Sequence, residues 1–224
     1  MSDRRLLITI DGPAGSGKST LAKLLAECYS LAYLDTGAMF RAAALWLGPE
    51  ADSLPDTEIL SRLHALDFAL KGIGRGTTLL VNGQPLTDSI RTEAVGYRAS
   101  SLAKLASVRL ALKTAQQTIG RTTPLVAEGR DMGSVVFPEA DFKFFLDAAP
   151  EERARRRWQQ LMELGREEPY EELLEQIRRR DEQDRTRSEA PLMPAKGAIC
   201  LDTTRRTRDE SLQAMIQAIE SASG

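Results

Sequence analysis

The fold is decided by residues 6–23, LLITIDGPAGSGKSTLAK. The apolar run 6–10 predicts a buried strand, and the apolar spacing from Lys18 onward predicts a helix. Between them, residues 12–19 follow the pattern GxxxxGKS, in which glycines let successive backbone N–H groups point at an anion. The helix that follows presents its positive N-terminus to the same anion. The stretch therefore predicts a strand, a phosphate-binding loop and a helix, the unit called a P-loop.

This loop predicts a site for ATP and Mg²⁺. The Lys18 nitrogen can reach the β- and γ-phosphates, and the Ser19 hydroxyl can bind a Mg²⁺ ion that bridges them. A glycine-rich turn that only caps a helix is the plainer alternative, although it does not require the complete pattern. The predicted ATP-binding residues of the loop are Gly12, Pro13, Ala14, Gly15, Ser16, Gly17, Lys18, Ser19 and Thr20.

Other nucleotide-binding classes lack their signatures in this sequence. The guanine reader Asn-Lys-x-Asp is missing, because the only asparagine, Asn82, is followed by glycine. The dinucleotide fingerprint fails because its third glycine falls on Thr20. The only histidine, His64, is remote from every motif, in an amphipathic stretch that predicts a partly exposed helix. These observations disfavour a GTP switch, a dinucleotide enzyme and a histidine base.

The rest of the chain alternates short apolar runs with helical stretches, which predicts an α/β fold with a parallel sheet flanked by helices. We expect five central strands, at residues 6–10, 31–34, 125–127, 142–146 and 198–201. We expect helices at residues 18–28, 38–47, 95–118, 150–164, 170–184 and 207–220, the third being long enough for two. Together with the loop, this pattern indicates a P-loop NTPase fold.

One segment interrupts the alternation. Residues 66–70 and 77–81 look like antiparallel strands on either side of a glycine-rich turn, and the tight turn Asn82-Gly83 follows. We therefore expect one domain, 1–224, that carries a small antiparallel and helical insert for a monophosphate. The expected parts are a core of 1–59, 96–150 and 196–224, the insert at about 60–95, and a helical lid at about 151–170 with a following helix, 170–187.

Two further motifs predict an acceptor site. Residues 35–41, DTGAMFR, form a turn that opens a helix, from which Arg41 could clamp a phosphate with two hydrogen bonds. Without other evidence, an ordinary exposed helical arginine is the better explanation of Arg41. Residues 128–133, EGRDMG, follow an apolar strand, so their charged side chains emerge where open α/β sheets bind ligands.

Residues 151–187 contain ten arginines, eleven acidic residues and no lysine. Interleaved charges in near balance predict, for most of these side chains, a solvated helix pair joined by salt bridges. Two subsets suggest function. Arg153, Arg156 and Arg157 share one helix face, from which a lid could close over the triphosphate. The spacing of Arg180, Asp184 and Arg187 places two guanidinium groups around a carboxylate, which suits a sugar hydroxyl beside a phosphate.

Composition limits the partners and the compartment. A net charge of -2 argues against non-specific binding of nucleic acid. The early apolar run 6–10 is too short to span a membrane or to act as a signal peptide, so we expect a cytoplasmic protein. The two cysteines, Cys28 and Cys200, lie in apolar segments and are predicted to be reduced core residues. A self-contained pattern with a polar surface leads us to expect a monomer.

Four blocks of sequence, residues 8–20, 35–41, 128–138 and 184–194, resemble those of the bacterial cytidylate kinases. The resemblance extends over nearly the whole chain and includes the insert. It implies that Arg41, Arg130 and Arg187 bind the acceptor phosphate and that Arg180 and Asp184 hold the ribose. It also implies that Ser100, Arg109 and Asp131 read cytosine. Thr36, where some relatives have serine, is expected to contact the substrate through its hydroxyl.

The implied cytosine reader has a physical basis. Cytosine presents an amino donor beside an acceptor nitrogen, which a carboxylate and a guanidinium complement, whereas uracil would turn a carbonyl oxygen toward the carboxylate. Among the departures from the family pattern, Phe40 replaces a common tyrosine and puts a hydrogen bond there in doubt. Ser134 replaces a common threonine and preserves a hydroxyl.

The resulting hypothesis is ATP-dependent phosphorylation of CMP or dCMP in pyrimidine nucleotide metabolism. The acceptor phosphate is already ionised, so catalysis needs alignment and charge neutralisation and no protein base. The catalytic residues would be Lys18, Arg130, Arg187, Arg156 and Arg157, and Arg153 with Arg157 would bind ATP from the lid. The alternatives are a P-loop kinase for UMP or a hydroxylated metabolite, and a nucleotide-binding ATPase or switch module.

Overall fold

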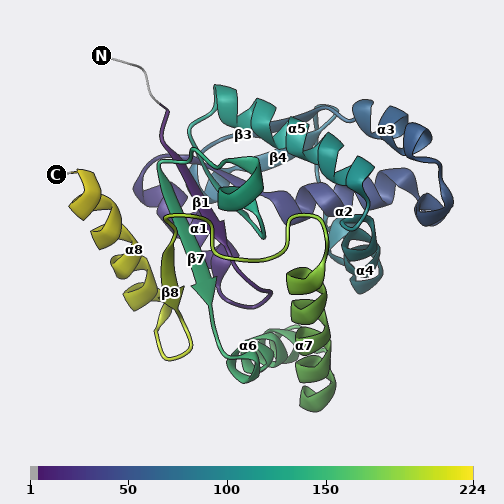
Figure 1. Ribbon diagram of the computed structural model, residues 1–224. Helices are drawn as coiled ribbons and strands as arrows, with labels where there is room; N and C mark the ends of the chain where they lie inside the picture. Colours follow the sequence, from purple (N-terminus) through teal and green to yellow (C-terminus); the bar gives the residue numbers. More distant parts are fainter. Residues whose placement is uncertain (1–4, 224) are drawn as a thin grey trace.

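A parallel sheet of five strands forms the centre of the molecule, as predicted (Figure 1). The computed structural model describes residues 5–223. The strands are β1 Leu7–Asp11, β2 Ala32–Asp35, β6 Leu125–Gly129, β7 Phe142–Asp147 and β8 Ile199–Asp202, and each begins within one residue of its predicted start. They lie in the order β2-β6-β1-β7-β8, and every neighbouring pair is parallel. The carboxyl ends of all five strands therefore lie at the same end of the sheet, where open α/β sheets bind ligands.

Helices cover both faces of this sheet because side chains alternate between the faces along each strand. Ile8 and Ile10 of β1 pack with α1 and α8 in one buried cluster. Leu125 and Ala127 of β6 point to the other face and pack with α2 and α5. The covering helices are α1 Lys18–Cys28, α8 Arg208–Ser223, α2 Thr36–Leu47 and α5 Ala106–Thr122. The predicted α/β architecture is thus confirmed.

The small antiparallel sheet of the insert is also confirmed, with order β3-β4-β5. Its strands are β3 Phe68–Lys71, β4 Thr78–Val81 and β5 Gln84–Pro85. The turn between β4 and β5 uses Asn82 and Gly83, both with positive φ. The third strand was not expected, because two residues are too short for an apolar pattern. Helix α3 (Asp56–His64) was also not expected as an element, although it contains His64 as proposed.

The insert is attached to the body through backbone and apolar contacts. Gly74 donates its N–H to the carbonyl of Leu31 (2.7 Å), and Tyr33 of β2 donates its N–H to the Thr77 hydroxyl (3.1 Å). Phe68 belongs to the main core cluster, and further apolar residues of the insert pack against that cluster. The small sheet is therefore fastened to the edge of the large one beside β2.

The long helical stretch predicted at 95–118 is two helices, α4 (Glu93–Leu102) and α5. The Thr92 hydroxyl caps α4 by accepting the N–H of Val95 (3.3 Å). A short helix, η3 (Asp88–Arg91), leads into α4. A single π-turn, η4 (Met132–Val136), follows β6, and such turns are frequent at functional sites.

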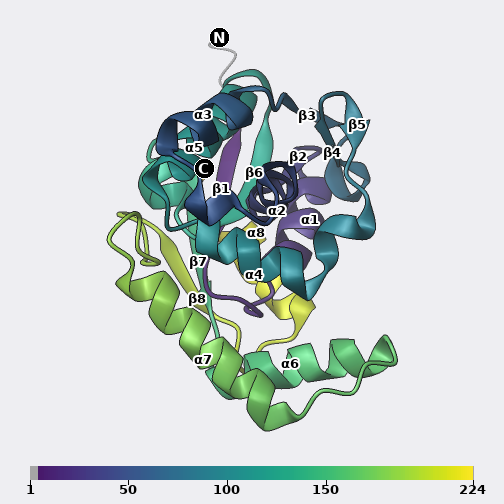
Figure 2. The ribbon, with the colours of Figure 1, turned by 90° about the vertical axis from the view of Figure 1, so that its right-hand side faces the viewer.

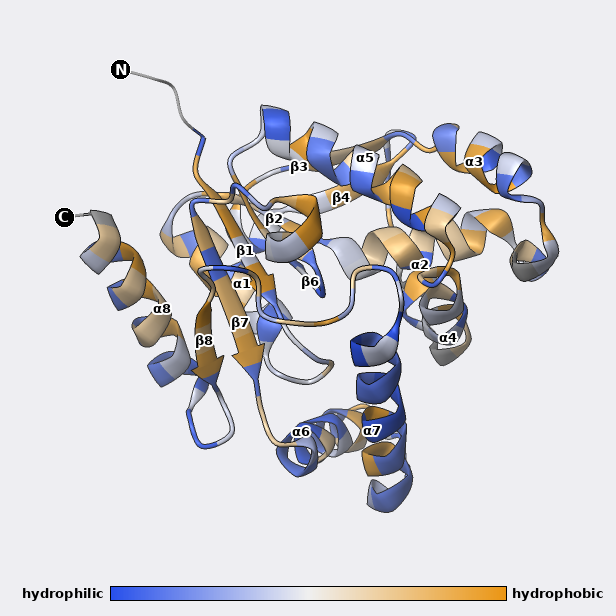
Figure 3. Ribbon diagram, in the orientation of Figure 1, coloured by the Kyte–Doolittle hydropathy of each residue, from blue (hydrophilic) through white to orange (hydrophobic). Residues whose placement is uncertain are grey.

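Helices α6 (Pro150–Glu163) and α7 (Tyr170–Thr186) form a hairpin that projects from the sheet on the side of its carboxyl ends (Figure 2). We call this hairpin the lid. It has its own small apolar cluster of Ala154, Leu174 and Ile177. Figure 3 shows that the rest of its surface is strongly hydrophilic, in contrast to the central strands. The charge-balanced composition of residues 151–187 therefore corresponds to a solvated helix pair, as predicted.

One expectation about the core is wrong: Cys28 and Cys200 are exposed, although both are unpaired thiols as expected. Cys28 is the last residue of α1, and Cys200 lies on β8, an edge strand with only one neighbour. Both positions have an apolar local sequence but nothing that packs over them. Among residues 5–223, none of the helices is long and apolar enough to cross a bilayer.

Candidate active site

The loop after β1 has a backbone that only glycine tolerates. Gly12 has φ +149°, and a Cβ on it would lie 2.0 Å from the carbonyl oxygen of Leu146 in β7. Gly17 adopts the left-handed conformation immediately before α1 begins. These glycines draw the loop against the carboxyl end of the sheet, with the N-terminus of α1 behind it. The predicted succession of strand, glycine-rich loop and helix is therefore present in the fold.

Lys18 lies inside this loop and is only 6% exposed. Its ammonium group donates to the Pro13 carbonyl (2.6 Å). Burial, and then the neighbouring Arg130, lower the pKa of the Lys18 ammonium, while Glu128 opposes this shift. A cation whose charged form is disfavoured by burial and by a second cation is suited to a site that takes up an anion.

A buried carboxylate network adjoins Ser19. Glu128, at the end of β6, accepts the hydroxyl of Ser19 (2.9 Å) and the phenol of Tyr33. Burial, and then the charge of Asp35, raise the pKa of Glu128. Glu128 was predicted to follow a strand, but no individual role was predicted for it. A hydroxyl next to a carboxylate is an oxygen donor set of the kind that Mg²⁺ prefers, so these residues fit that ion.

Asp11, the last residue of β1, was also not predicted as a site residue. Its carboxylate, 2% exposed, accepts the N–H groups of Met132 and Gly133 (both 2.8 Å). Burial raises the pKa of Asp11 to about 6, even though these two N–H groups lower it. The carboxylate therefore fixes the turn η4 against β1. Its position directly before Gly12 was the only sequence signal.

The predicted acceptor residues converge from separate elements. Arg130, after β6, donates from Nε to the Asp184 carboxylate of α7 (2.9 Å). Arg187, just beyond α7, lies 3.8 Å from Asp184 and 4.0 Å from Asp131. Arg109 of α5 donates to the other oxygen of Asp131. We call these five side chains the arginine cluster: Arg109, Arg130, Asp131, Asp184 and Arg187. The first and the last of them are more than 70 residues apart in the sequence.

The arginine cluster has an excess of buried positive charge. Burial, and then Arg109, lower the pKa of Arg187, and its Nη2 is buried without a hydrogen-bond partner. Burial alone would raise the pKa of Asp184, but Arg130, Arg180 and Arg187 lower it overall. The same Arg130 and Arg180 also act on Lys18. The loop and the arginine cluster are therefore neighbouring cationic sites.

Three further residues that were predicted to bind the substrate do not belong to the arginine cluster. Arg41 donates to the carbonyls of Ile90 (3.0 Å) and Thr92 (3.3 Å), at the lead-in to α4. The Thr36 hydroxyl donates to the carbonyl of Glu128 (2.7 Å). Ser100 lies on α4 and is partly buried. The structure therefore associates Arg41 and Ser100 with the insert side and Thr36 with the end of β6.

The lid arginines lie at different depths. Arg156 donates to the carbonyl (2.6 Å) and hydroxyl (3.2 Å) of Thr203, and that hydroxyl donates to the carbonyl of Ser16 (3.1 Å). Thr203, 2% exposed, was missed because its sequence context is an ordinary loop. Arg157 is partly buried. Arg153 is 1% exposed, and four of its five N–H groups have protein acceptors, so little of its surface remains for the predicted ATP contact.

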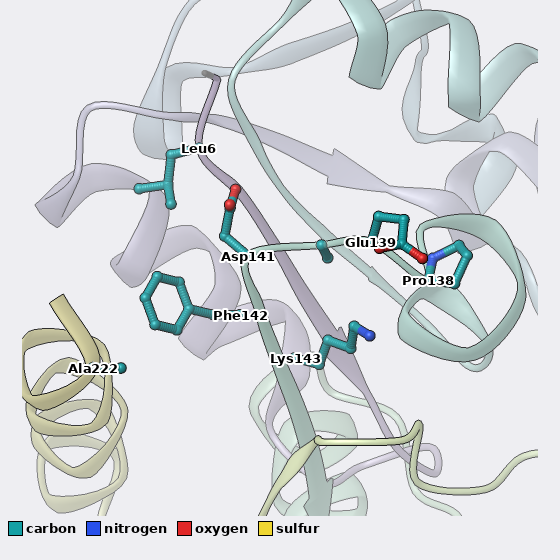
Figure 4. A pocket seen from close by; sticks show the side chains of 8 residues that line it. Leu6, Pro138, Glu139, Asp141, Phe142, Lys143 and Ala222 are labelled. Carbon is teal, nitrogen blue, oxygen red and sulfur yellow. The ribbon is translucent and has the colours of Figure 1, made fainter. Parts of the chain in front are cut away.

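A hollow of about 490 Å³ lies at the opposite end of the sheet (Figure 4). Leu6 and Phe142, which line it, stand at the starts of β1 and β7, and Ala222 of α8 lies across from them. Because the P-loop follows the other end of β1, this hollow is separate from the candidate active site.

Comparisons with known proteins agree with this geometry. A family model described as "Cytidylate kinase" matches residues 8–221. A cytidylate kinase of Maridesulfovibrio salexigens is 54% identical over 202 residues, which cover 90% of this chain and 91% of the relative. One from Nitratidesulfovibrio vulgaris (strain Hildenborough) is 50% identical over 218 residues, or 97% and 94% of the two chains. The crystal structure of an uncharacterized protein from Eubacterium ventriosum has a TM-score of 0.50 at 14% identity, covers 97% and 99% of the two chains, and resembles this chain in fold alone.

Proposed function

Because the chain belongs to the cytidylate kinase family, we propose that it transfers the γ-phosphoryl group of ATP to CMP or dCMP, giving ADP and CDP or dCDP. The observation that carries this proposal is the pair of neighbouring cationic sites. One is the P-loop with its buried Lys18, and the other is the arginine cluster, in which Nη2 of Arg187 has no hydrogen-bond partner. Two anions that repel each other can be brought together where fixed cations face both of them.

ATP would bind with its phosphates on the P-loop, residues 12–20. Backbone N–H groups and Lys18 would hold the β- and γ-phosphates, while Arg156 and Arg157 would approach from the lid. Mg²⁺ would be held by Ser19, with Glu128 oriented by Tyr33 beside it, and would neutralise charge on the phosphates. Arg156 supports this arrangement because it already reaches the loop through Thr203.

The acceptor nucleotide would lie against the arginine cluster. Its phosphate would be bound by Arg130 and Arg187, with Arg41 approaching from the insert side, and its ribose by Arg180 and Asp184. Arg109 and Asp131 would face the cytosine edge, with Ser100 and Thr36 adding hydroxyl groups. The ion pair of Asp131 with Arg109 supports this role, since it presents an acceptor and a donor side by side.

Transfer requires only alignment and neutralisation of charge. An oxygen of the acceptor phosphate attacks the γ-phosphorus in line with the leaving ADP oxygen, and no proton has to be removed from it. Lys18, Arg130 and Arg187 would stabilise charge as it shifts between donor and acceptor. Closure of the lid would exclude water, which would otherwise accept the phosphoryl group.

We also propose that the insert, about 60–95, is the monophosphate-binding part of a single domain, and that residues 151–187 act as the lid. We further propose a cytoplasmic monomer. One chain would suffice for this activity, because it supplies every residue that is proposed to contact a nucleotide.

A substrate panel tests the proposed function. Turnover with ATP and Mg²⁺ is measured for CMP, dCMP, UMP and AMP. We expect CMP and dCMP to be preferred, with UMP disfavoured by about 5- to 150-fold, as for other base-edge contacts. A preference for UMP or AMP would contradict the acceptor assignment. Equal ATP hydrolysis with and without a monophosphate would instead favour an ATPase module.

A further inference from the structure

Arg153 is one of the largest fully buried side chains in the described part of the protein. A buried guanidinium is costly unless its N–H groups have acceptors. Its Nε donates to the Ala148 carbonyl (2.8 Å), its Nη1 to the Ala14 carbonyl (3.2 Å), and its Nη1 and Nη2 to the Asp181 carboxylate. Arg153 therefore connects three segments: the end of β7, the P-loop and α7.

On the P-loop side, Arg153 fixes the orientation of a peptide group. The Ala14 carbonyl points toward Arg153, and because a trans peptide is planar, the N–H of Gly15 points the opposite way. That direction leads away from the lid helix α6. A Cβ on Gly15, whose φ is +79°, would lie only 3.0 Å from the Cβ of Arg153, so α6 packs directly on the loop. Arg153, which lies outside the loop, thus fixes the direction of the Gly15 N–H, one of the groups proposed to bind phosphate.

On the other side, Arg153 positions α7. Its planar guanidinium meets both oxygens of Asp181, a geometry that fixes direction as well as distance. Asp181 adjoins Arg180 and lies one turn before Asp184, which pairs with Arg130 in the arginine cluster. The position of α7 relative to Arg153 therefore determines where two proposed ribose ligands lie.

We propose that Arg153 is a positioning residue that couples the donor site to the acceptor site, so that ATP on the P-loop strengthens binding of the acceptor nucleotide. This inference rests on the proposed placement of the two nucleotides. One guanidinium holds both the backbone that cradles the donor phosphates and the helix that carries acceptor ligands. A shift of either transmits to the other through contacts that touch neither nucleotide.

The test measures the affinity of the intact protein for CMP by titration calorimetry, with and without a non-hydrolysable ATP analogue and Mg²⁺. We expect the analogue to tighten CMP binding to the wild-type protein by about tenfold, within the usual range of coupling between sites. In Arg153→Lys and in Asp181→Asn, this factor should fall to about twofold or less, while each nucleotide alone still binds. The double variant should be no worse than either single one, because both remove the same link.

Arg155→Lys is the matched control, since Arg155 is an exposed arginine of the same helix that pairs with Glu152. It should keep the wild-type coupling factor. A lower melting temperature with unchanged coupling in both Arg153→Lys and Asp181→Asn would overturn the proposal, since a purely structural role has that signature. It would also be overturned if Arg153→Lys weakened ATP binding and Asp181→Asn had no effect, or if the wild type showed no coupling.

The outcome is interpretable even if one variant does not fold. Asp181→Asn is close to isosteric and alone tests the link, because Asp181 is not proposed to contact a nucleotide. Failure of the wild type to bind CMP at all would refute the proposed function itself. Binding of both nucleotides without coupling would refute only the role of Arg153.

Discussion

The donor and acceptor halves of the active site are built differently. The donor half is one continuous loop, residues 12–19, shaped by glycines that fit tightly against the sheet. The acceptor half is the arginine cluster, whose members come from α5, the turn after β6, and the end of α7. The donor half therefore depends on local backbone, and the acceptor half depends on how distant elements pack.

The attachments of the lid and the insert extend this contrast. The insert shares the main apolar core, whereas the lid has a core of its own and reaches the body through polar contacts such as Arg156 with Thr203 and Arg130 with Asp184. Apolar packing favours a fixed position, while polar contacts such as these can be replaced by hydrogen bonds to water when two parts of the molecule separate. The acceptor ligands on α7 are thus on the part of the molecule best able to move.

The largest effect should follow removal of Lys18 from the donor half. Lys18→Ala should lower kcat by about 10³-fold, the scale for losing a preorganised charge at the reacting group. Because the donor half does not select the acceptor, the ratio of CMP to UMP turnover should stay the same. Steady-state kinetics with both substrates would check this, and a changed ratio would break the proposed separation of the halves.

Arg187→Met should come next and should affect the acceptor. We expect kcat/KM for CMP to fall by about 10²-fold, since a buried guanidinium would be lost from the phosphate site, while KM for ATP changes by less than about threefold. Arg185→Met is the control, because Arg185 is an exposed arginine of α7 paired with Asp147. Equal losses in the two variants would argue for a general effect on the helix.

The buried carboxylate of Asp11, which holds the turn η4 against β1, should give the protein a pH-dependent stability. Burial raises the pKa of Asp11 to about 6, above its ordinary value of 3.8. The folded protein then binds more protons than the unfolded chain between these values, so this group's contribution to stability falls as the pH rises from about 4 to 6. The free energy of unfolding should drop by about 2 kcal/mol across that window relative to Asp11→Asn. Chemical denaturation of both proteins at several pH values measures the difference, and parallel pH profiles would refute the raised pKa.

The smallest effect should be on base selection. Asp131→Ala should reduce the preference for CMP over UMP by about tenfold, since it removes the carboxylate that repels the uracil carbonyl. KM for ATP should not change. An unchanged CMP-to-UMP ratio in competition assays would remove Asp131 from the base-reading role and sharpen the question of which acceptor residue selects cytosine.

Much of the fold was legible from local pattern. Helix α1 begins and ends at the predicted residues, because the P-loop fixes its start and the apolar spacing of Leu21 and Leu25 fixes its face. Helix α3 was not predicted, because its nine residues bury only Ile59 and Leu63 and so carry a short apolar pattern. The exposed Cys28 and Cys200 show the limit of local hydropathy, which does not reveal where a helix or an edge strand lacks a covering layer.

The site was predicted unevenly for the same reason. Arg130, Asp131, Asp184 and Arg187 were singled out by motif and resemblance, and the structure brings them together. Asp11, Tyr33 and Thr203 were not singled out, because each acts through a hydrogen bond to a residue far away in the sequence. The inward orientation of Arg153 could not be distinguished by spacing from that of Arg156 and Arg157 on the same helix face.

By itself, the sequence determined the strand, loop and helix that bind phosphate, since glycines and a lysine at fixed spacing shape a backbone within a few residues. It also determined the layered α/β plan, because apolar periodicity requires that each element be covered. Only the tertiary structure decided which arginines share a pocket and which one is buried as a link. Those outcomes depend on the crossing order of the strands and on charges that meet after packing, and neither is encoded in any single stretch of chain.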